Sequence, residues 1–189
     1  MDSALILSSS EKSTAFFADM LRAAAIGQIF ALQTGGEARR LLMERDFDLI
    51  IINAPLRDET GESLSRTIAS KGMSQVILVV GSEHFEDVSA QTEEYGVFTV
   101  AKPTTRTMFW SALKLAKSAV SRMRRMQEEN SRLKQQIEDI RLVDRAKCIL
   151  ISYLGMSEQE AHRHIEKQAM DMRTTKRDVA EGILKMYEN

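Results

Sequence analysis

Short apolar runs alternate with segments of helical spacing along the first part of the chain. The runs lie at Ala4–Leu7, Gln28–Leu32, Leu49–Ile52, Val76–Val80 and Val97–Ala101. Their length and their Val and Ile content predict buried strands. Between them, apolar residues recur three or four positions apart, which predicts helices. Five strands alternating with five helices indicate repeated βαβ units, and therefore a parallel sheet covered by helices on both faces.

The stretch between Pro103 and Gly155 contains no glycine or proline, and it predicts one long helix or two nearly continuous ones. Within it, two series of residues match the a and d positions of a heptad repeat: Met123, Asn130 and Ile137, and Ala119, Met126, Leu133 and Ile140. This pattern predicts a coiled coil that dimerises the chain, and an Asn at an a position favours a parallel two-stranded coil. The alternative is a solvated helix that packs one face on its own domain.

The segment from Leu142 onwards predicts three short helices, of which the first ends at Gly155. Two pairs of residues have the spacing of capping boxes and begin the second and third helices: Ser157 with Glu160, and Thr175 with Asp178. Each predicted helix has one apolar face, so the helices must pack against one another or a partner. Small residues such as Ala161 allow close approach, and we expect Met170 to fill the core of this bundle.

Composition and charge narrow the classes of function. Hydrophobic residues make up 43% of the chain and charged residues 28%, which is typical of a soluble globular protein. Apolar runs such as Leu49–Ile52 are too short to cross a membrane. The absence of an export signal and the single cysteine, Cys148, favour a cytoplasmic location. Residues 1–119 hold 12 Lys+Arg and 15 Asp+Glu, whereas residues 120–189 hold 14 and 12, which points to a polyanion partner for the C-terminal part.

The third and fifth predicted strands carry specific motifs. Asp48-Leu49-Ile50-Ile51-Ile52-Asn53 is followed by Gly61, and Lys102-Pro103 ends the fifth strand. With these motifs, residues 1–118 resemble the receiver domain of bacterial two-component response regulators, which implies a flavodoxin-like α/β fold. The resemblance also implies a phosphoryl-accepting carboxylate, an acidic pair that holds Mg²⁺, and a Thr or Ser on the fourth strand. The matching positions here are Asn53, the pair Ser8 and Ser9, and Val80, with Lys102 the one residue retained.

These substitutions remove the receiver's chemistry. A carboxamide is a poor nucleophile towards phosphorus, and two hydroxyls cannot replace the charge that holds the metal. We therefore predict a pseudo-receiver without phosphorylation, metal or cofactor, in which Lys102 bonds Asn53, the serines or local carbonyls. A phosphorylation site at Asp48 or Asp58 remains the alternative.

The C-terminal segment keeps an order of small and polar residues: Ala146-Lys147, Gly155-Met156-Ser157, Ala169-Met170 with Arg173, and Val179-Ala180. In this it resembles the ANTAR domain, the three-helix module of bacterial transcription antiterminators that bind RNA hairpins. The resemblance implies an RNA hairpin as partner. Basic side chains that could contact phosphates or loop bases are Lys147, Lys167, Arg173, Lys176 and Arg177. We expect three domains: a pseudo-receiver at 1–118, a coiled-coil dimerisation helix at 119–141, and an ANTAR three-helix bundle at 142–189.

Taken together, the sequence predicts a dimeric RNA-binding antiterminator acting on hairpins in leader mRNA. Its pseudo-receiver would respond to a regulatory protein or a small ligand rather than to phosphorylation. An enzyme is disfavoured, because there is no nucleophile with a base and an orienting group, no phosphate-binding glycine loop and no metal-ligand cluster. The alternatives are a DNA-binding transcription factor of the response-regulator kind, since short helices also dock in the DNA major groove, and a coiled-coil scaffold that binds a partner.

Overall fold

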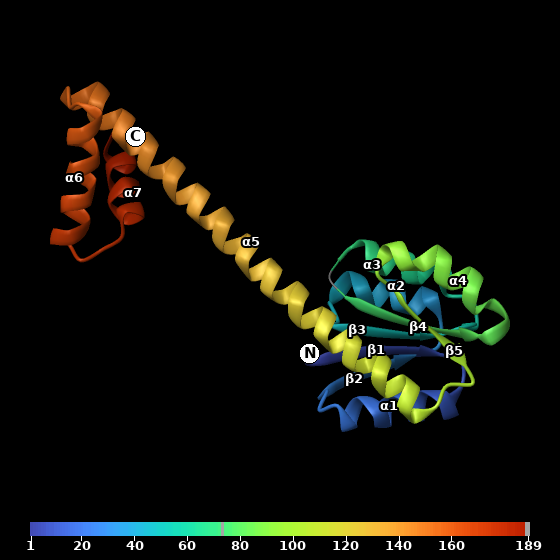
Figure 1. The fold of residues 1–189 in the computed structure, drawn as a ribbon. Coiled ribbons are helices and arrows are strands. Elements are labelled where there is room, and N and C mark those ends of the chain that lie inside the picture. Colours follow the sequence, from blue (N-terminus) through green and yellow to red (C-terminus); the bar gives the residue numbers. More distant parts are fainter. Residues whose placement is uncertain (73, 188–189) are drawn as a thin grey trace. The chain divides into compact units, whose positions relative to one another are not determined.

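The computed structural model describes residues 1–72 and 74–187. The chain divides into two compact units, Met1–Arg124 and Arg125–Asn189. One helix, α5 (Arg106–Leu154), runs through this boundary and contributes to both units (Figure 1). In the described residues no helix is both long enough and apolar enough to cross a membrane.

The N-terminal unit is a five-stranded parallel sheet with the strand order β2-β1-β3-β4-β5. Its strands are β1 (Ser3–Ser8), β2 (Gln28–Leu32), β3 (Leu49–Asn53), β4 (Gln75–Gly81) and β5 (Phe98–Lys102). The segments between them form α1 (Glu11–Ala23), α2 (Gly35–Glu44), α3 (Glu62–Ser70), η1 (Ser82–His84), α4 (Phe85–Thr92) and η2 (Glu93–Tyr95). The predicted flavodoxin-like parallel sheet is confirmed, because this strand order is one of the two common doubly wound arrangements.

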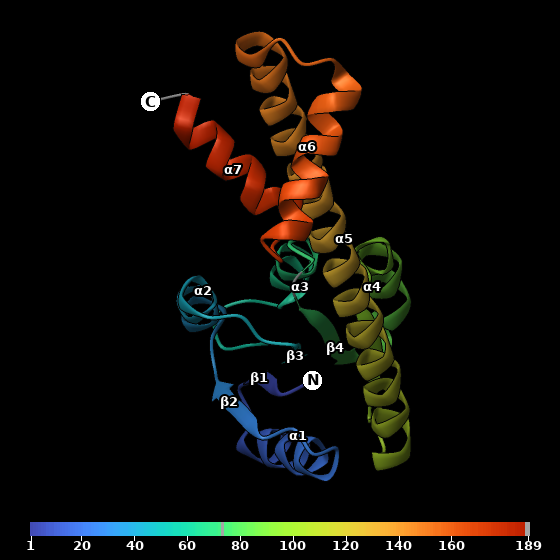
Figure 2. The ribbon, with the colours of Figure 1, turned by 90° about the vertical axis from the view of Figure 1, so that its left-hand side faces the viewer.

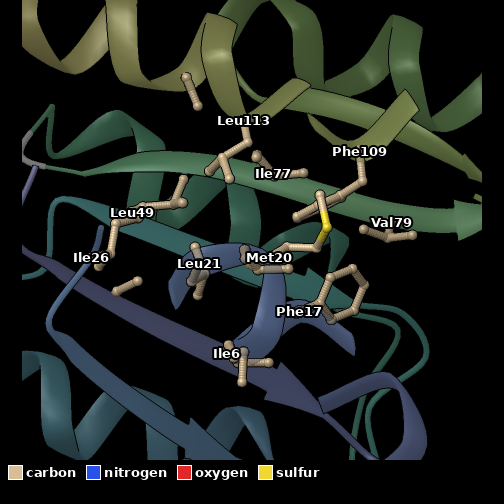
Figure 3. Packing of buried hydrophobic residues seen from close by; sticks show 14 of the residues in the cluster. Ile6, Phe17, Met20, Leu21, Ile26, Leu49, Ile77, Val79, Phe109 and Leu113 are labelled. Atoms are coloured by element: carbon tan, nitrogen blue, oxygen red, sulfur yellow. The ribbon is translucent and has the colours of Figure 1, made fainter. Parts of the chain in front are cut away.

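Both faces of the sheet are buried, because consecutive strand residues point to opposite sides. Leu49 and Ile51 lie in a cluster with residues of α1 and α5, whereas Ile50 and Ile52 lie in a second cluster with residues of α2, α3 and α4. Figure 3 shows the first cluster, in which the Phe17 ring of α1 lies 4.8 Å from the Phe109 ring of α5, centroid to centroid. The uninterrupted apolar run of β3 follows from this two-sided burial.

The first part of α5 completes the N-terminal unit. Phe109, Leu113, Ala116 and Val120 are buried at spacings of one helical turn. At the end of this part, the Arg124 guanidinium lies 2.6 Å from Asp48 Oδ1 and 3.2 Å from Asp2 Oδ2. Burial acts to raise the Asp48 pKa, but the N–H groups of Asp2 and Ser3 and the Arg124 guanidinium hold that pKa below its usual value.

The helix α5 continues without a break through Leu142, so the prediction of one long helix is confirmed and the alternative of two nearly continuous ones is wrong. No glycine or proline stands between Pro103 and Gly155 to end a helix. The helix ends only before Gly155, which adopts a left-handed conformation with φ of 67° and donates its N–H to the Ile151 carbonyl at 3.1 Å. The last part of α5 therefore serves as the first helix of the bundle.

The C-terminal unit packs the end of α5 against α6 (Glu158–Asp171) and α7 (Lys176–Tyr187) (Figure 2). Its core consists of Ala146, Ile149, Leu150, Ala161, Ile165, Ala169, Val179, Ala180, Ile183 and Leu184. The capping box at the start of α6 is confirmed, since Ser157 N donates to Glu160 Oε2 at 2.8 Å and Glu160 N donates to Ser157 Oγ at 3.3 Å.

The prediction that Met170 fills this core is wrong, because its side chain is 79% exposed. The helix turns by about 100° per residue, so Met170 points away from the bundle although its neighbour Ala169 is buried. A long apolar side chain on the surface of α6 therefore needs another explanation.

Candidate functional site

The carboxyl ends of β1 and β3 bring Ser8 and Asn53 together. These two residues face each other in the parallel register of the strands, and both are buried. The Asn53 Nδ2 group donates a hydrogen bond of 2.9 Å to Ser8 Oγ, which in turn donates to the Ser10 carbonyl at 3.2 Å. An amide and a hydroxyl that bond each other occupy the positions where the receiver resemblance implies carboxylates.

The other residues at the receiver-like positions, Lys102, Ser9 and Val80, also make contacts within the N-terminal unit or are buried in it. The Lys102 ammonium donates to the Ala54 carbonyl, which agrees with the expectation of a local bond. Burial lowers the pKa of Lys102, and the Glu83 carboxylate opposes this shift. Ser9 is exposed and donates to the Pro55 carbonyl at 3.2 Å, and Val80 is a buried apolar residue of β4.

The two alternative aspartates are engaged elsewhere. Asp48 precedes β3 and bonds Arg124, so it lies at the amino end of the strand rather than at the crevice. Asp58 accepts from the N–H groups of Gly35 at 2.8 Å and Gly36 at 3.0 Å, at the start of α2, and these bonds lower its pKa. Among the described residues, no three His, Cys, Asp or Glu side chains are grouped so as to hold a metal ion.

The predicted dimerisation seam is an exposed apolar stripe on α5. Met126, Leu133, Ile137 and Ile140 are between 46% and 62% exposed. Asn130 is exposed within this stripe and donates to the Met126 carbonyl of its own helix at 3.3 Å, and Met123 is half-buried in the N-terminal unit. Four large apolar side chains at heptad spacing are unusual on a solvated helix, because such patches generally mark interaction surfaces.

Three of the five candidate RNA-binding residues form ion pairs between helices. Lys147 of α5 lies 2.8 Å from Asp144 of the same helix and 3.0 Å from Glu158, the first residue of α6. Lys176 of α7 pairs with Glu166 of α6. Arg177 lies 2.6 Å from Asp139 of α5 and 2.9 Å from Glu181. These contacts link all three helices of the bundle, and hydrogen bonds to Asp144 and Glu158 raise the pKa of Lys147.

The other two candidates, Lys167 and Arg173, are exposed and have no ion pair within the described part of the chain. Arg163 is also exposed and without an ion pair among the described residues, and it is not among the candidates predicted from the sequence. It stands four residues before Lys167 on α6, and both residues lie opposite the buried face of that helix. The sequence could have predicted this position, because the spacing of Arg163 from the apolar residues Ala161 and Ile165 places it on the outer face of an amphipathic helix.

Arg173, two residues after the end of α6, has an unusual backbone conformation. Its φ is +52°, a left-handed value that side chains other than glycine adopt at a cost of roughly 1–2 kcal/mol. Its N–H donates to the Met170 carbonyl at 3.2 Å, and the Thr174 N–H donates to the Ala169 carbonyl at 2.9 Å. This is the pattern of a Schellman motif, in which glycine is the usual residue at this position. The chain therefore carries an arginine at a position where the backbone conformation favours glycine.

Comparison with known proteins adds to this geometry. The family model of the ANTAR domain matches residues 131–184. The transcriptional regulatory protein PdtaR of Mycobacterium tuberculosis H37Rv is 28% identical over 167 residues, which cover 88% of this chain and 82% of the relative.

Solved structures share the fold of the N-terminal unit. The signal receiver domain of an HD domain-containing protein from Pseudomonas fluorescens Pf-5 aligns with a TM-score of 0.57 at 21% identity, covering 67% of this chain and 92% of that domain. The chemotaxis response regulator CheY4 of Vibrio cholerae aligns with a TM-score of 0.53 at 16% identity, covering 61% and 98%.

The N-terminal unit therefore has the fold of the receiver domains of response regulators. With an ANTAR match at residues 131–184 behind this fold, and in its likeness to PdtaR, the chain resembles ANTAR response regulators. The ANTAR match and the likeness to PdtaR together support an RNA-binding antiterminator family.

Proposed function

We propose that this protein is a dimeric transcription antiterminator, without enzymatic activity, that binds hairpins in leader mRNA. The observation that carries the proposal is the ANTAR match at 131–184, which coincides with a folded three-helix bundle that exposes cations. The description of PdtaR as a transcriptional regulatory protein supports a role in transcription.

The mechanism follows from competition between two RNA structures. A bound hairpin that shares bases with a terminator stem prevents that stem from forming, so transcription continues. The bundle would take sequence information from loop bases, because the major groove of A-form RNA is too narrow for side chains to read. Basic side chains would add contacts to phosphates, which depend strongly on salt concentration.

Dimerisation would occur along the proposed coiled-coil helix, residues 119–141. The exposed stripe of Met126, Leu133, Ile137 and Ile140 supports this, since a second copy would bury it. Asn130 lies in the middle of the stripe, where an Asn pair fixes register and favours two parallel strands.

We expect the full-length protein to enrich specific sequences from a library of RNA hairpins with randomised loops. In a gel-shift measurement the selected hairpin should be retarded, whereas duplex DNA of the same stem sequence should not be, because loop bases supply the specificity. Stronger binding to the duplex would favour the DNA-binding alternative. A library that yields no enriched hairpin would contradict the antiterminator and favour a scaffold.

We also propose that phosphorylation does not control this receiver. Acetyl phosphate with Mg²⁺ should leave the mass of the purified protein unchanged, because Ser8, Ser9 and Asn53 offer neither the nucleophile nor the metal-binding charge. Intact-mass spectrometry would detect a phosphoryl group as an increase of about 80 Da. A phosphorylatable receiver treated in parallel is the positive control, and a stoichiometric adduct on any aspartate would refute the proposal. Control would then come from a regulatory protein or a small ligand.

A further inference from the structure

The outer face of α6 combines cations with an exposed apolar side chain. Arg163, Lys167 and Met170 are spaced four and three residues apart, so they lie on one face of the helix. All three are exposed, and Met170 is among the most exposed large apolar residues of the chain. The opposite face carries Ala161, Ile165 and Ala169, which are buried in the bundle. Arg173 follows one turn after Met170. These four residues are called the α6 face below.

Charge distinguishes this face from the other basic cluster of the bundle. Lys147, Lys176 and Arg177 line a hollow of about 400 Å³, but Asp139 and Asp144 line the same hollow. Each of these cations already bonds a carboxylate. A phosphate that approached them would have to displace those carboxylates or lie beside them, and like charges repel.

The cations of the α6 face are not engaged in this way. Within residues 74–187, neither Arg163, Lys167 nor Arg173 forms an ion pair. A phosphate bound there would gain a charge-assisted hydrogen bond without breaking an existing one.

We propose that the α6 face is the surface that contacts the loop of the RNA hairpin, an inference that rests on the proposed function. Arg163 and Lys167 bind loop phosphates, and Arg173 binds a phosphate or an unstacked base at the end of the helix. Met170 packs against an exposed base, for which its flexible, polarisable thioether is suited. Lys147, Lys176 and Arg177 act mainly in holding the three helices together.

The backbone at Arg173 supports this assignment independently of charge. Glycine at this position would relieve the left-handed conformation, so the arginine is present despite a cost in stability. Strained positions of this kind concentrate at functional sites.

The test compares variants for binding to the hairpin selected with the wild-type protein. The double variant Arg163→Ala with Lys167→Ala should bind about 100-fold more weakly, from about tenfold for each lost charged contact. The slope of log Kd against log salt concentration should fall by about 1.4, the value for two phosphates of a single strand. Lys117→Ala with Arg122→Ala is the matched control, since these exposed residues of α5 carry the same charge and lie in the N-terminal unit.

Three further variants separate binding from folding. Arg173→Gly should raise the melting temperature of the bundle and still lose about tenfold in affinity, which a purely structural role would not produce. Met170→Gln should weaken binding about fivefold or more, whereas Met170→Leu should bind as the wild type does. With a hairpin whose loop is abasic, the difference between these two Met170 variants should vanish.

A variant of the ion-paired cations Lys147 and Arg177 decides which surface of the bundle binds the RNA. Lys147→Gln with Arg177→Gln removes the same charge, and the proposal expects a smaller loss than for the α6 double variant, with circular dichroism confirming an intact bundle. A larger loss there, or wild-type affinity of the α6 double variant, would overturn the inference while leaving the RNA-binding function in place. Absence of hairpin binding by the wild-type protein would instead refute the proposed function, and this inference with it.

Discussion

Lysine at both Leu133 and Ile140 should convert the proposed dimer into a monomer. Both residues occupy d positions on the exposed stripe of α5, where each would pack against its counterpart in a parallel coil. Burial of one Leu or Ile side chain contributes about 1.5–3 kcal/mol, and two such side chains are lost from each protomer. The variant also places like charges across the seam, which destabilises the assembly further. Sedimentation velocity at micromolar concentration measures the outcome.

A matched control keeps the added charge and changes only its position. Ser131→Lys with Gln135→Lys introduces two lysines at exposed positions on the outer face of the same helix. Ser131 stands two residues before Leu133, and Gln135 stands five residues before Ile140, so neither occupies an a or d position. This control should remain dimeric. A dimer that persists with lysine at both seam positions would show that another surface holds the two chains together.

Leucine in place of Ala161 should unfold the C-terminal unit and abolish RNA binding with it. Ala146, Ala161 and Ala180, one from each helix of the bundle, have no exposed surface. Added methylene and methyl groups at such a site force the helices apart, and overpacking costs typically about 1–3 kcal/mol. The bundle core comprises only a small set of residues, so its stability is small and a loss of this size is enough to unfold it.

Hydrogen exchange resolves this effect by region. Amides of α6 and α7 should lose protection, whereas amides of the five strands should keep theirs, because the two units have separate apolar cores. Ser152→Leu is the control, since it adds a similar side chain at an exposed position of the same unit. Unchanged protection of α6 in the Ala161→Leu variant would show that the bundle has room for a larger residue.

The apolar pattern of the sequence was sufficient to predict the strands and most of the helices. Each strand of the sheet includes the core of a predicted run, because a strand buried on both faces must be apolar throughout. The start of α6 was also predictable, since a capping box is made by residues three positions apart. The same holds for the receiver-like positions of β1 and β3, because the sequence shows directly that Ser8 and Asn53 carry no carboxylate.

Other features depend on contacts that sequence spacing does not specify. The sequence predicts one long helix or two nearly continuous ones before Gly155 and does not decide between them, because the heptad pattern and the bundle pattern are two different apolar faces of one helix. The exposure of Met170 was missed because hydrophobicity indicates a preference for burial and not the direction in which a side chain points.

The sequence by itself determined the parallel sheet, the order of the helices and the loss of the receiver's acidic residues, because these follow from local periodicity and from residue chemistry. The tertiary structure alone decided which cations of the bundle are already paired. Lys147 meets Glu158 across the turn at Gly155, and Arg177 meets Asp139, which is 38 residues earlier in the chain. Such pairs form only when helix packing brings distant residues within hydrogen-bond reach, and that packing leaves Arg163, Lys167 and Arg173 exposed on α6.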